Sequence, residues 1–79
     1  MKQLLETAVN KLMAPYTPEQ VQMMQTEVNQ IISDILAKAE TIRPACTSDK
    51  AALQMAVVDG LYATDDRKRA MAMMIIKNI

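Results

Sequence analysis

The sequence predicts an all-α domain of three or four helices, built on one long central helix from about Pro18 to Ile42. Apolar residues recur at three- and four-residue intervals along most of the chain, which is the spacing of one helix face. Prolines and capping residues divide this pattern into four segments, about 2–14, 18–42, 49–62 and 65–78. The 79 residues leave room for a single domain, because domains typically hold about 100–150 residues.

The first two helices are delimited by local signals. Helix 2–14 carries a three- and four-spaced apolar stripe and ends before Pro15, since proline disfavours helical geometry in the preceding residue. Thr17-Pro18-Glu19-Gln20 then has the form of a capping box, in which the side chains of Thr17 and Gln20 satisfy otherwise unpaired backbone donors. Proline at the first helical position agrees with a helix start at Pro18.

The second helix is long for so small a domain. It runs from Pro18 to Ile42 without Gly or Pro and stops at Arg43-Pro44. Twenty-five helical residues span about 37 Å, whereas a compact domain of this size is about 30 Å across. We therefore expect the helix to overhang its domain and a second copy or a partner to cover the overhang. The prediction is a homodimer.

The last two helices are more apolar. Thr47-Ser48-Asp49 supplies caps for helix 49–62, whose apolar residues cover most of its circumference, as in a central buried helix. Gly60 near its end either allows close helix packing or begins termination. Thr64-Asp65-Asp66 caps the final helix, in which residues 70–76 are all apolar. A monomer would expose a wide apolar face there.

The residue inventory excludes several kinds of chemistry. The chain has no His, one Cys and one Gly, which rules out zinc fingers, histidine acid–base catalysis, intrachain disulfides and glycine-rich phosphate loops. The adjacent carboxylates Asp65 and Asp66 are typical of helix caps rather than of an acid–base pair. We expect no enzymatic activity, no cofactor and no metal.

Eight methionines are the most unusual feature of the chain. Methionine adapts to irregular surfaces and recurs on protein-binding faces. Met24 and Met55 fall on apolar stripes and are expected in the core. For a partner-binding or dimer interface, the sequence predicts the following residues: Met23, Ile31, Ile35, Met71, Met73, Met74 and Ile75. The leading hypothesis is a non-enzymatic regulator, an adaptor or inhibitor that binds another protein stoichiometrically through this Met-rich face.

A dimeric DNA-binding regulator is the first alternative, because Arg67-Lys68-Arg69 is the only basic cluster. Around Gly60 the spacing of a helix-turn-helix is met in part, with Ala56 before the glycine and Leu61 after it. Later positions that require apolar residues are polar. The nine basic and nine acidic residues also give no global field that would attract nucleic acid.

A self-assembling structural or secretion subunit is the second alternative. The ending Ile75-Ile76-Lys77-Asn78-Ile79 resembles that of type III secretion needle subunits, a family of short helical hairpins that polymerise through apolar ends. The similarity covers five residues. The chain departs from that family because its turn at residues 15–18 lies far from mid-chain, so membership is not assigned.

The expected location is the cytoplasm. The longest apolar run, from Ala70 to Ile76, has seven residues, against the roughly 20 needed to span a bilayer. Polar residues also interrupt the start of the chain before an apolar run of signal-peptide length can form. We expect no membrane association, and Cys46 is expected to be a reduced thiol.

Overall fold

The computed structural model describes residues 1–79 and contains four α-helices, one short 3-10 helix and no strand. The elements are α1 (Lys2–Met13), α2 (Pro18–Ile42), η1 (Arg43–Ala45), α3 (Asp49–Val58) and α4 (Asp66–Lys77). The all-α prediction is confirmed, and α2 has the predicted bounds. The capping box is also present: Thr17 Oγ1 accepts from the backbone N–H of Gln20, and Gln20 Oε1 accepts from that of Thr17.

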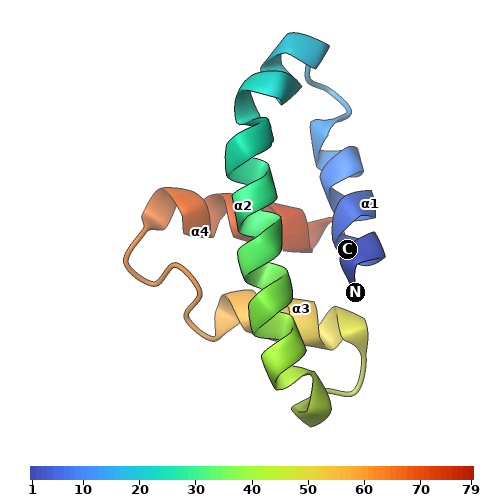
Figure 1. Ribbon diagram of the computed structural model, residues 1–79, viewed down its shortest axis with the longest axis vertical. Coiled ribbons are helices and arrows are strands. Elements are labelled where there is room, and N and C mark those ends of the chain that lie inside the picture. Colours follow the sequence, from blue (N-terminus) through green and yellow to red (C-terminus); the bar gives the residue numbers. More distant parts are fainter.

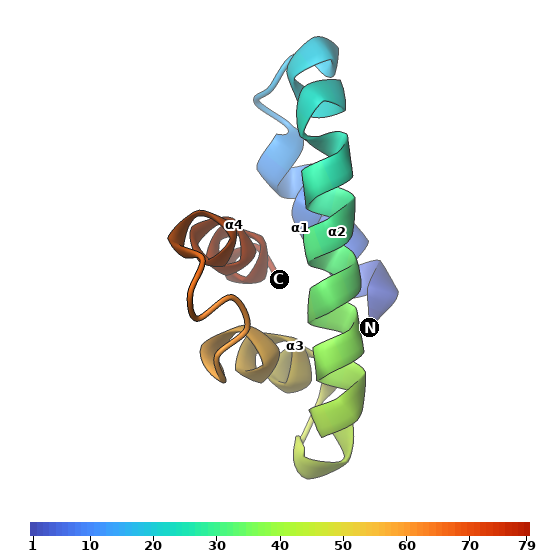
Figure 2. The same ribbon diagram turned by 60° about the vertical axis from the view of Figure 1, so that its left-hand side comes forward.

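The helices form two crossing hairpins. α1 runs alongside α2 in the opposite direction, and α3 and α4 form a second hairpin that crosses α2 steeply (Figure 1). Both helices of the second hairpin lie on one side of α2 (Figure 2). The molecule measures 39 × 26 × 17 Å, so α2 spans nearly its whole length. The first turns of α2 extend beyond α3 and α4, and there only α1 and the segment that follows it lie beside α2 (Figure 1).

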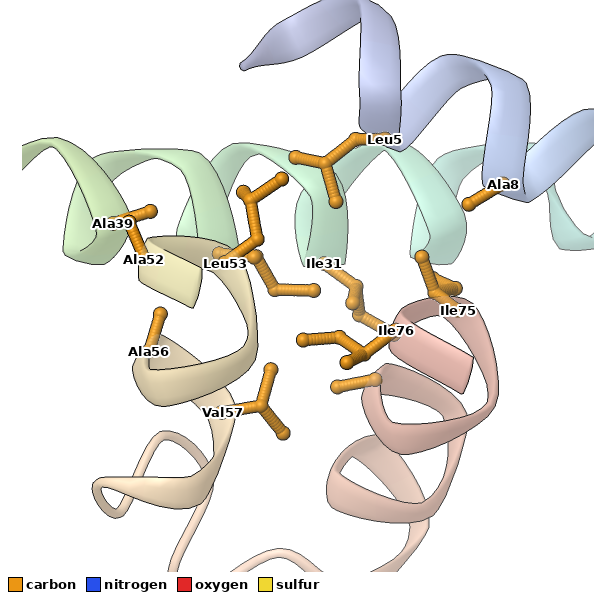
Figure 3. Close-up of a cluster of buried hydrophobic side chains, with 12 residues drawn as sticks. Leu5, Ala8, Ile31, Ala39, Ala52, Leu53, Ala56, Val57, Ile75 and Ile76 are labelled. Carbon is orange, nitrogen blue, oxygen red and sulfur yellow. The ribbon is translucent and has the colours of Figure 1, made fainter. Parts of the chain in front are cut away.

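One core joins all four helices. Ile31, Ile35 and Ala39 follow one another at four-residue intervals along α2, and side chains from α1, α3 and α4 converge on this stripe (Figure 3). The residues from the other helices are Leu5, Ala8, Ala52, Leu53, Ala56, Val57, Ala72, Ile75 and Ile76. Five of the twelve core residues are alanines, and their small size lets the helix backbones approach closely.

Three of the predicted interface residues lie in this core. Ile31, Ile35 and Ile75 are 0% exposed, so the interface prediction is corrected for them. Helical spacing identified the apolar face of α2, but the chain's own α3 and α4 cover that face in place of a partner. Met55 requires the opposite correction, because its side chain is 48% exposed on α3 rather than buried.

The third helix ends earlier than predicted. It stops at Val58 instead of residue 62, and the backbone N–H of Asp59 closes the last turn on the carbonyl of Met55 at 2.8 Å. Gly60 has φ +98° and Tyr62 φ +60°, in the left-handed region that ends helices. Of the two roles considered for Gly60, termination is the one observed. The other helix bounds differ from the predicted ones by one residue at most.

The loop after α3 is attached to the long helix by Tyr62. Its phenolic O–H donates a hydrogen bond to Oδ2 of Asp34 on α2. Burial, and then the hydrogen bond to the Asp34 carboxylate, raise the pKa of Tyr62 above its ordinary value of 10.0. Because ionisation would place two negative charges side by side, the loop contact requires the neutral phenol.

The core stripe on α2 predicts a graded response to truncation. Ile35→Ala should reduce the free energy of unfolding by about 2–5 kcal/mol, since it removes buried methyl groups and leaves a cavity. Ile32→Ala is the matched control, because Ile32 is only half-buried on the same helix. Urea denaturation followed by circular dichroism measures both. Equal losses for the two variants would contradict the assigned core.

The contact between Tyr62 and Asp34 predicts alkaline sensitivity. The folded state holds the pKa of Tyr62 above its unfolded value, so this contribution to stability is complete below pH about 10 and is lost as the pH rises beyond it. Urea midpoints measured across that range should fall more steeply for the wild-type chain than for Tyr62→Phe, which has no phenol to ionise. Parallel curves would show that the phenol contributes nothing.

Candidate protein-binding surface

The outward face of α4 carries two of the four exposed methionines. Ala72, Ile75 and Ile76 turn into the core, and the rotation of about 100° per residue then places Met73 and Met74 toward solvent. These side chains are 47% and 48% exposed. Met71 is half-buried and packs against the edge of the core. The face is therefore anchored by the same helix that completes the core.

Three adjoining hollows surround these side chains. The largest, of about 410 Å³, lies between α3 and α4 and is lined by Lys50, Gln54, Met73, Met74, Ile76, Lys77 and Ile79. The second, of about 280 Å³, lies at the end of α3 and is lined by Val57, Val58, Gly60, Ala63, Arg69 and Met73. The third, of about 190 Å³, lies among α1, α2 and α4 and is lined by Leu12, Met13, Tyr16, Met24, Arg67, Ala70, Met71 and Met74.

Shared methionines place the three hollows next to one another. Met73 lines the first and second hollows, and Met74 lines the first and third. Met24 of α2 and Met71 of α4 complete the lining of the third. We call Met24, Met71, Met73 and Met74 the methionine face. It is a concave apolar surface of the kind that accepts a protruding side chain or helix from another molecule.

The predicted interface residues divide into three groups. Met71, Met73 and Met74 lie on α4 and line the hollows, and their role in an interface stays a prediction. Met23 is 86% exposed on α2 and lines none of the three hollows. The core residues Ile31, Ile35 and Ile75 take no part. Met24 was expected in the core, and only the packing of α2 against α4 shows that it lines a hollow with Met71.

The basic cluster at the start of α4 does not form a single patch. An Nη atom of Arg67 lies 2.9 Å from Oε2 of Glu27 on α2. The ammonium of Lys68 lies 5.7 Å from the centre of the Tyr62 ring. Arg69 forms no ion pair and lines the second hollow. Two of the three cations thus have partners within the fold, and the cluster offers a DNA backbone one unpaired charge.

Other polar groups serve local structure. Oδ1 of Asp65 accepts from the backbone N–H of Lys68 at 3.0 Å, as an N-cap. Nε of Arg43 lies 2.6 Å from Oδ1 of Asp49, and this hydrogen bond is the main cause that holds the pKa of Asp49 below 3.8. Cys46 is a free, half-buried thiol. No three Cys, Asp or Glu side chains are grouped so that they could hold a metal ion.

Comparison with protein-family models, curated proteins and solved structures found no match to the chain. None of the helices combines the length and the apolar content that a membrane span requires.

Proposed function

We propose that this chain is a non-enzymatic regulator, an adaptor or inhibitor that binds another protein stoichiometrically through the methionine face. The observation that carries the proposal is the half-exposure of Met73 and Met74 where three adjoining hollows meet. A chain whose core contains few large side chains leaves these two uncovered. A partner that covers them would remove apolar surface from water, which contributes a favourable free energy of about 25 cal/mol for each Å² buried.

The chemistry of methionine suits this role. The side chain is unbranched and polarizable, so it can adjust its rotamers to the shape of a partner while its helix stays fixed. α4 is fixed here through Ile75 and Ile76, which are buried on its inner face. The proposed surface therefore combines a rigid backbone with adaptable side chains, and binding would not require the domain to rearrange.

The other sequence hypotheses have narrower support. The homodimer stays a prediction. Because Ile31, Ile35 and Ile75 are in the core, a second copy cannot contact them. It could still cover the exposed first turns of α2, where Met23 lies. DNA binding is less well supported, because Arg67 is paired with Glu27. No observation favours open polymerisation over these alternatives.

Site-specific cross-linking tests the proposed function. A photo-reactive amino acid replaces Met74 in one variant and Met23 in another, and each chain is irradiated in the cells that naturally express it. We expect the variant with the photo-reactive group at position 74 to give one discrete cross-linked product, which contains one copy of this chain and one copy of another protein. Position 23 is the matched control, because it is more exposed but lies outside the methionine face.

Two outcomes would contradict the proposal. A product of two copies of this chain from position 74 would assign the face to self-association. Equal yields of the same products from positions 74 and 23 would show that exposure alone, rather than the hollows, decides the contacts. The products are identified by mass spectrometry of the cross-linked peptides.

A further inference from the structure

The rim of the methionine face is cationic. Lys50 and Lys77 line the first hollow, Arg69 the second and Arg67 the third. No Asp or Glu side chain lines any of the three. The chain as a whole carries nine basic and nine acidic residues, so this one-sided distribution is local. It arises where α3 and α4 meet.

Three of these four cations have no partner within the fold. Arg67 forms an ion pair with Glu27, whereas no ion pair is formed by Lys50, Arg69 or Lys77. Asp66 lies on the outer side of α4, but it is two turns before Met73 and lines none of the hollows. Unpaired charges around an apolar centre favour a ligand with the complementary arrangement, an apolar ridge flanked by carboxylates.

We propose that the occupant of the methionine face is an acidic amphipathic helix of the partner protein. This inference rests on the proposed function and names the chemistry of its partner. Apolar side chains of the helix fill the hollows around Met73 and Met74, and its flanking carboxylates pair with Lys50, Lys77 and Arg69. A helix fits better than a strand, because this all-helical fold offers no sheet edge to which a strand could add.

The charges also oppose a second copy at this surface. A symmetric dimer places the same patch against itself, and the rim would then bring lysines and Arg69 near their own counterparts. Such like-charge contacts cost free energy at an interface. An anionic membrane would also match the charges, so vesicles are included in the test, but the hollows beside Met73 and Met74 suit protruding side chains of a partner helix.

Two synthetic peptides provide the test. Both are amphipathic, about 18 residues long, with leucines at three- and four-residue spacing; one carries Glu and the other Lys at the remaining positions. Binding of each labelled peptide to the full chain is measured by fluorescence anisotropy. We expect the Glu peptide to bind at least about tenfold more tightly than the Lys peptide, since its charges complement the rim. A scrambled Glu peptide with no apolar face should bind weakly.

Variants locate the contact. Lys50→Glu with Lys77→Glu should weaken binding of the Glu peptide about tenfold and strengthen binding of the Lys peptide. Lys11→Glu with Lys2→Glu is the control for net charge, because both lysines are exposed on α1 and line none of the three hollows at the methionine face; it also removes the surface ion pair of Lys2 with Glu6. Met73→Gln with Met74→Gln should weaken binding without reversing the charge preference. Thermal unfolding confirms that each variant is folded.

Several results would overturn the inference. One is equal binding of the two peptides, or no binding of either. Another is an unchanged preference in the chain carrying Lys50→Glu and Lys77→Glu. Binding to phosphatidylcholine–phosphatidylglycerol vesicles or duplex DNA, but not to the Glu peptide, would assign the cations to those ligands instead. A heteromeric cross-link from position 74 without a charge preference would retain the regulator and remove only the acidic helix.

Discussion

The packing of α3 and α4 against Ile31 and Ile35 of α2 determines the arrangement of the helices. Ile31 and Ile35 are fully buried in the core that all four helices share; α3 packs directly on this stretch of α2, whereas α1 packs mainly against α4. The core is small, with 13 of 79 residues buried. Each of the other helices therefore contributes a narrow inner face to the core, and the side chains on its opposite face are exposed to solvent.

This limitation produces the methionine face. α4 contributes Ala72, Ile75 and Ile76 to the core. Because residues 70–76 are all apolar, apolar side chains also lie on the part of the helix circumference that faces away from the core. Met73 and Met74 consequently stand beside hollows that none of the four helices fills. The surface area of 5141 Å² exceeds the roughly 4,800 Å² typical of a monomer of this mass, which agrees with an elongated fold that leaves apolar surface uncovered.

Local signals were sufficient to predict α2, because the Thr17 cap and Pro44 define its ends through neighbouring residues. They were insufficient for the end of α3, where the choice between a packing role and a terminating role for Gly60 depends on the following loop. Periodicity likewise identified Ile35 as part of an apolar face without revealing what covers it. The cationic rim could not be predicted at all, since Lys50 and Lys77 come together only through the packing of α3 against α4.

We propose that the folded chain leaves its methionine face uncovered by its own copies. Isotope-labelled methionine methyl groups, observed by nuclear magnetic resonance over a range of protein concentrations, test this directly. We expect the signals of Met73 and Met74 to keep their positions and widths from dilute to concentrated solution, even where Met23 responds to dimerisation. Shifts or broadening of the Met73 and Met74 signals with concentration would contradict it and assign the face to self-association.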